Sequence, residues 1–130
     1  MVILVDHNIE GQAALLWSML HTLGWLDLVP MRMVRFSDVN LARSSNDRDI
    51  WHFVQAQQMI LLTANRNMDG PDSLEQTIRD ANQWTSLPVI TISDADQLLD
   101  ITYRERCATR LTEIVLYVND YLGVGRLFIP

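Results

Sequence analysis

Short, continuous runs of apolar residues alternate along this chain with longer stretches in which apolar residues recur every three or four positions. The runs at Val2–Val5, Met59–Thr63 and residues 87–92 are typical of strands buried on both faces of a parallel sheet. Residues 31–36 and Arg126–Ile129 predict two further strands. We therefore expect five strands, separated by periodic or polar segments.

The periodic stretches predict four amphipathic helices. Asn8 is the expected N-cap of the first helix, and Gly24 is its expected stop. The second helix begins near Asp47, the third covers residues 73–84, and Ser93 is the expected cap of the fourth. The apolar stripe of the fourth helix, which Gly123 follows, consists of Leu98, Ile101, Ala108, Leu111, Val115, Val118 and Leu122.

This alternation predicts an α/β fold, a three-layer α/β/α sandwich with a central, mainly parallel sheet. We expect residues 1–130 to form a single domain. In such sheets the carboxyl ends of the strands meet at one edge, and ligands bind at that edge. The residues that follow each strand are therefore the candidates for a functional site.

The composition narrows the classes of function. The 130 residues carry a net charge of −6, and none of the basic residues is lysine. The negative net charge argues against a broad basic surface that binds nucleic acid, but it is compatible with a local site for a cation. The lack of lysine argues against a phosphoacceptor receiver domain, since that class uses a lysine after its last strand. A Rossmann nucleotide binder is also disfavoured, because no Gly-x-Gly-x-x-Gly follows the first strand.

The chain shows no sign of a membrane or export segment. No apolar run approaches the ~20 residues that span a bilayer, and the first residues lack the basic region of a signal peptide. The single cysteine, Cys107, has no partner for an internal disulfide. We therefore expect a cytoplasmic protein without a membrane partner. The residues expected in the core include Cys107, Trp17, Trp25, Trp51 and Trp84.

Oxygen-bearing side chains gather where the strands end. They are Asp6 and Asn8 after the first strand, Asp47 at the start of the second helix, and Asn65, Asn67 and Asp69 after the third strand. Carboxylate and amide oxygens suit Mg²⁺ or Mn²⁺ rather than zinc. Each residue also has a simpler explanation, because acids cap helices and both Asn and Asp favour turns. We expect His7 to point away from Asp6, since side chains alternate along an extended chain.

The order and spacing of these residues resemble the PIN-like family of metal-dependent nucleases. The matching segments are Val-Ile-Leu-Val-Asp6-His-Asn, Asp47-Arg-Asp-Ile50 and Ile-Leu-Leu-Thr63-Ala-Asn65-Arg-Asn67. The resemblance covers residues 2–70 and continues beyond them only in the order of elements. It implies a PIN-like fold with Mg²⁺ or Mn²⁺ as cofactor.

Carried over residue by residue, the resemblance implies a set of roles. Asp6 and Asp47 match the first two acids of the family, and Thr63 matches the residue that closes the third strand. Asn65 and Asn67 stand where the family carries acids, and Asp69 is placed to compensate. The implied catalytic set is Asp6, Asp47, Asn65, Asn67 and Asp69, with Asp6, Asp47 and Asp69 as metal ligands. The expected substrate contacts are Thr63 and Asn8, together with Arg43, Arg48 and Arg66, which flank the acidic edge and can contact phosphates.

Two functions remain open at this stage. One is a metal-dependent ribonuclease of the toxin-like kind, whose substrate is RNA. The other is a PIN-like fold that has lost its chemistry and binds a protein partner, which the two asparagines in place of acids favour. The fourth helix and residues 127–130 can build a homodimer or pack on the chain's own sheet.

Overall fold

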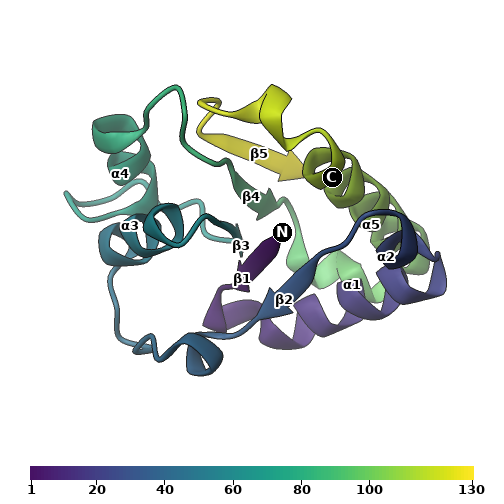
Figure 1. Ribbon diagram of the computed structural model, residues 1–130. Helices are drawn as coiled ribbons and strands as arrows, with labels where there is room; N and C mark the ends of the chain where they lie inside the picture. The colour runs from purple at the N-terminus through teal and green to yellow at the C-terminus, as the bar shows by residue number, and fades with distance from the viewer.

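The computed structural model describes residues 1–130 and confirms the predicted fold class. Five strands form one sheet in the order β2-β1-β3-β4-β5, and every neighbouring pair is parallel (Figure 1). The strands are β1 (Val2–Val5), β2 (Arg32–Val34), β3 (Met59–Thr63), β4 (Val89–Ile92) and β5 (Arg126–Ile129). All five expected strands are present, although β2 and β4 are shorter than the apolar runs that predicted them.

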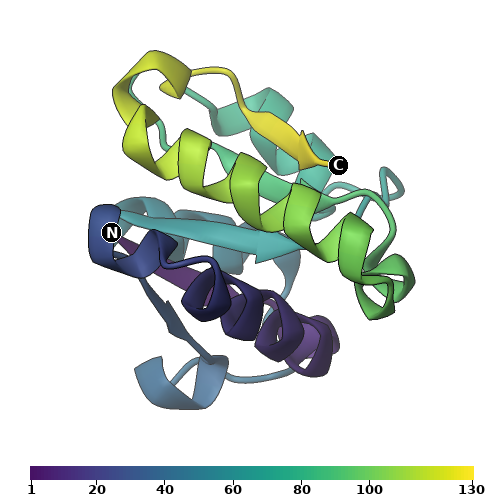
Figure 2. The same cartoon turned by 90° about the vertical axis from the view of Figure 1, so that its right-hand side faces the viewer.

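Helices cover both faces of the sheet, which makes the three layers. On one face α1 (Glu10–Thr22) and α5 (Ile101–Leu116) lie side by side, and the short α2 (Trp25–Leu28) follows α1 (Figure 2). On the other face lie α3 (Asp47–Ala56) and α4 (Leu74–Ala81) (Figure 1). None of the helices combines the length and apolar composition that crossing a membrane requires.

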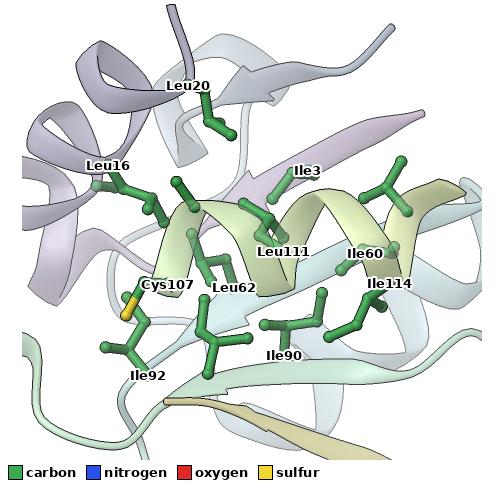
Figure 3. Close-up of a cluster of buried hydrophobic side chains, with 14 of the residues drawn as sticks. Ile3, Leu16, Leu20, Ile60, Leu62, Ile90, Ile92, Cys107, Leu111 and Ile114 are labelled. Atoms are coloured by element: carbon green, nitrogen blue, oxygen red, sulfur yellow. The ribbon is translucent and has the colours of Figure 1, made fainter. Parts of the chain in front are cut away.

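The sheet separates two clusters of buried side chains. Alternate residues of β1, β3 and β4 face α1 and α5, and this larger cluster includes the labelled residues of Figure 3: Ile3, Leu16, Leu20, Ile60, Leu62, Ile90, Ile92, Cys107, Leu111 and Ile114. The other residues of the strands face α3 and α4, where Leu4, Leu61 and Val89 pack on Trp51 and Val54. Because both faces are covered, the strands are apolar at nearly every position.

The predicted fourth helix has the wrong bounds. A 3₁₀ turn, η3 (Ala95–Leu99), comes first, and extended backbone at Asp100 (ψ 124°) separates it from α5. A second 3₁₀ turn, η4 (Val118–Tyr121), follows α5. The expected caps at Asn8 and Ser93 are also wrong, because Asp6 caps the 3₁₀ turn η1 (His7–Ile9) and Asp94 caps η3. A remaining 3₁₀ turn, η2 (Phe36–Val39), follows β2.

Most of the predicted stripe of the fourth helix packs on the chain's own sheet. Leu98, Ala108, Leu111 and Val115 are buried, whereas Ile101 is exposed. The packing of these residues explains their spacing without a second copy of the chain. A homodimer through this helix stays a prediction.

The third helix is shorter than predicted, and Trp84 is not in the core. α4 ends at Ala81, because Asn82 is extended (ψ 133°) and its side-chain amide donates to the Gly123 carbonyl at 2.8 Å. Trp84 then lies in a turn with 84% of its surface exposed. A Cβ at Gly123, whose φ is +82°, would lie 2.9 Å from the Trp84 Cα atom, so the two backbones meet closely.

Candidate functional site

The centre of the candidate site lies between β1 and β3. The sheet order places β2 on one side of β1 and β3 on the other, so this is the switch point at which open α/β sheets bind ligands. Asp6 follows β1, Thr63 ends β3, and the Asp6 N–H donates to the Leu62 carbonyl at 2.9 Å. The Thr63 hydroxyl donates to Asp6 Oδ2 at 2.7 Å, and Asp6 is only 9% exposed. The two residues thus form a buried, charge-assisted hydrogen bond.

His7 lies beside Asp6 rather than pointing away from it. The chain enters the 3₁₀ turn η1 at His7, so the alternation of an extended strand no longer applies. His7 Nδ1 is 3.4 Å from Asp6 Oδ1, and the imidazole packs against Phe36 with ring centroids 5.3 Å apart. Asn8, a predicted substrate contact, is exposed, and its backbone N–H lies 3.5 Å from Asp6 Oδ1.

Asp47 joins the site through Asn65. The Asn65 side-chain amide donates to Asp47 Oδ2 at 2.9 Å, and the Leu74 backbone N–H donates to the same oxygen at 3.2 Å. Leu74 is the first residue of α4, where a negative charge is stabilised by the helix dipole. Asp47 therefore links the start of α3 to the start of α4.

The loop after β3 is built from a repeated hydrogen-bonded turn. The Asn65 N–H donates to Thr63 Oγ1 at 3.0 Å, the Asn67 N–H to Asn65 Oδ1 at 2.9 Å, and the Asp69 N–H to Asn67 Oδ1 at 3.0 Å. Each polar side chain therefore holds the backbone two residues further on. This ladder explains why polar residues recur at every second position from 63 to 69. It leads away from the buried site, because Asn67 and Asp69 are exposed.

The three predicted substrate-contacting arginines differ in their surroundings. Arg48 donates to the Pro71 carbonyl at 2.6 Å and to Asp80 at 2.8 Å, so it holds the far end of the same loop to α4. Its hydrogen bond is the main cause that lowers the pKa of the Asp80 carboxyl. Arg43 and Arg66 are exposed.

Sequence reasoning missed a second part of the site, centred on Arg126. Its guanidinium donates to the Asn65 carbonyl at 2.8 Å, to Thr91 Oγ1 at 2.6 Å and to Glu75 Oε2 at 3.1 Å. The only signal in the sequence was an arginine at the start of an otherwise apolar strand, a pattern shared by Arg32 of β2, which is exposed. Its partners are far away along the chain, so the sequence did not identify them.

The structure thus brings together Asp6, Thr63, Asn65 and Asp47 as one hydrogen-bonded chain. It does not gather the three expected metal ligands, since no group of three or more His, Cys, Asp or Glu side chains is placed to hold a metal ion. The orientation of the Asn65 amide is fixed, because its oxygen accepts from the Asn67 N–H and its NH₂ group must then face Asp47. The hydroxyl and amide donors occupy Asp6 Oδ2 and Asp47 Oδ2, and with no third acid placed beside the two carboxylates the arrangement does not fit a divalent cation.

No family model, curated protein or solved structure matches the chain.

Proposed function

We propose that this chain is a PIN-like module that binds a protein partner, and that its acidic site is structural. The observation that carries the proposal is the fixed Asn65 amide, which donates to Asp47 where a nuclease of this type has an acid. The carboxylates of Asp6 and Asp47 both receive hydrogen bonds from the protein itself, Asp6 from Thr63 and Asp47 from Asn65 and Leu74. Such a site is held together without a cation.

The loop of residues 64–72 is the element that we expect to meet the partner. It follows the switch point, and both of its ends are held, by Arg126 at Asn65 and by Arg48 at Pro71. Between these ends Met68 is 63% exposed. A loop fixed before binding loses little conformational entropy when it binds, and an exposed apolar side chain on such a loop suits a pocket on another protein.

The metal side of the proposal is tested by isothermal titration of EDTA-treated protein with Mn²⁺. We expect no saturable site in the wild type, and a site in Asn65→Asp, which restores the missing acid beside Asp47. Asn119→Asp is the matched control, because it adds the same charge at an exposed position in η4. A micromolar Mn²⁺ site in the wild type that Asp6→Asn removes would contradict the proposal.

The binding side is tested by affinity capture from a cell lysate with the wild type and with Met68→Asp. A partner that Met68→Asp loses is expected to remain bound to Leu99→Asp, the matched control. Leu99 is also strongly exposed but lies in η3, which packs against α1 and α5. Equal capture by all three proteins would show that the loop is not the contact surface.

A second candidate function is cleavage of RNA. The observation in its favour is that four residues implied by the family resemblance, Asp6, Thr63, Asn65 and Asp47, meet at the switch point of the sheet. The test is incubation of a fluorescent single-stranded RNA with the protein and Mn²⁺ or Mg²⁺. Cleavage that Asp6→Asn abolishes would establish this function in place of the first.

A further inference from the structure

Arg126 is a charged residue at the start of a strand, and it faces inward. It begins β5 and lies on the same face of the sheet as Thr91 of the neighbouring β4, to whose hydroxyl it donates at 2.6 Å. Its side chain is only 10% exposed. A guanidinium removed from water in this way is strongly destabilising unless hydrogen-bonded groups and a counter-charge surround it.

Arg126 has both. Its Nη2 donates to Glu75 Oε2 at 3.1 Å, and its Nη1 donates to the Asn65 carbonyl at 2.8 Å as well as to Thr91. One side chain therefore joins four segments: β5, β4, α4 and the loop after β3. The contacts need the branched guanidinium, because two different nitrogens reach different partners at the same time.

The contact with Asn65 is the one that bears on the site. Arg126 holds the backbone carbonyl of Asn65, while the side chain of Asn65 holds Asp47 and the Asn67 N–H. Movement of the Asn65 backbone would therefore break the bond to Asp47 and the start of the loop ladder together. Glu75, the acidic partner of Arg126, directly follows Leu74, whose N–H is bound to Asp47.

We propose that Arg126 is the positioning residue of the loop after β3. Its guanidinium, paired with Glu75, holds the Asn65 carbonyl and so fixes the residue whose side chain binds Asp47. This inference rests on the proposed function, in which the site needs no metal, and it assigns the fixing of the loop to one residue.

The test is amide hydrogen exchange measured by NMR on the wild type, Arg126→Gln, Arg126→Lys and Arg106→Gln. Arg106 is exposed on α5 and serves as the matched control. In Arg126→Gln the amides of Asn65, Asn67 and Asp69 are expected to exchange roughly tenfold faster or more, the effect of losing a hydrogen bond to a charged group. Amides of β1 and β3 are expected to keep their protection.

Arg126→Lys keeps the charge but not the branched donor, so partial protection of the loop is expected. This variant also carries the test if Arg126→Gln fails to fold. Glu75→Gln removes the counter-charge but keeps an acceptor for Nη2 and the bond from Arg126 to Asn65, so a smaller acceleration of the loop than in Arg126→Gln is expected. Unchanged loop exchange in folded Arg126→Gln, or equal acceleration throughout the protein, would overturn the inference.

Exchange measurements with EDTA distinguish a failure of this inference from a failure of the proposed function. Loop exchange in the wild type is expected to be the same with EDTA and with Mn²⁺, since Arg126 fixes the loop through the Asn65 carbonyl. If EDTA alone accelerates the loop, a metal holds it and the proposed function fails. If EDTA has no effect and Arg126→Gln also has none, the proposed function stands and the role of Arg126 is refuted.

Discussion

Replacing Thr63 by valine removes a hydroxyl with almost no change of shape, and this hydroxyl has two partners. It donates to the buried Asp6 carboxylate at 2.7 Å and accepts from the Asn65 N–H at 3.0 Å. Thr63 itself is fully buried, so water cannot take the place of the lost group without a rearrangement. The substitution therefore tests whether the site is held by hydrogen bonds within the protein.

The expected loss of stability follows from the two hydrogen bonds of the Thr63 hydroxyl. A hydrogen bond to a charged group contributes about 1.5–3 kcal/mol to stability. The Asn65 N–H is only partly buried and water can reach it, so its loss adds roughly 0.5–1 kcal/mol. We expect Thr63→Val to lower the free energy of unfolding by about 2–4 kcal/mol, a large part of the ~5–15 kcal/mol typical of such proteins. At about 4 °C per kcal/mol, Tm falls by roughly 8–16 °C.

The assay is urea unfolding followed by circular dichroism, with thermal unfolding as a second measurement, both in EDTA. Thr112→Val is the matched control. Thr112 is also buried, but its hydroxyl donates only to the Ala108 carbonyl four residues earlier in α5, so little change is expected. If Thr63→Val loses no more stability than Thr112→Val, the hydrogen bond does not hold the site and our account of Asp6 is wrong.

Further outcomes are expected for two glycines and for Cys107. Gly123→Ala should lower the free energy of unfolding in urea by more than about 2 kcal/mol, because φ of residue 123 is +82° and the new Cβ would meet the Trp84 backbone at 2.9 Å. Gly11 lies in α1, and a Cβ added there meets no atom within 4 Å, so Gly11→Ala should raise the free energy of unfolding by about 0.5–1 kcal/mol. Burial raises the pKa of the Cys107 thiol from its ordinary value of 9.0 to about 12, so the native thiol should not react with Ellman's reagent at pH 8 until urea unfolds the chain. Because the folded chain keeps this proton while the unfolded chain releases it, stability should fall by up to about 1 kcal/mol between pH 9 and 10, and the decline should be smaller in Cys107→Ala. A reactive native thiol, or identical pH profiles for the two proteins, would show that Cys107 is not sealed in the core.

The sequence determined the layers of this fold because burial leaves a local pattern. Strands covered on both faces must be apolar throughout, and β1 and β3 have the expected bounds for that reason. Local chemistry also decided some of the ends. Ser73 caps α4 by accepting from the Gln76 N–H, and Gly24 follows α1 with a φ of +75°. These features depend on residues a few positions apart.

Tertiary structure decided where the helices are interrupted and how Trp84 is placed. The periodicity of apolar residues predicted one long fourth helix, but η3 and α5 are separate segments with Asp94 and Asp100 as their caps. Trp84 is apolar and follows a helical pattern, yet the contacts of the neighbouring turn with Gly123 leave it in solvent. Periodicity records which residues favour burial, and only the packing of distant segments shows which of them are buried.

The candidate site shows the same division. From the sequence, Asp6, Thr63, Asn65 and Asp47 were expected at one edge of the sheet, because strand ends meet there. What each side chain binds was decided by folding, since the bond from Thr63 to Asp6 spans 57 positions and that from Arg126 to Asn65 spans 61. The sequence therefore determined which polar groups reach the edge. Only the tertiary structure decided that these groups satisfy one another, because hydrogen bonds and ion pairs depend on distances that no local pattern encodes.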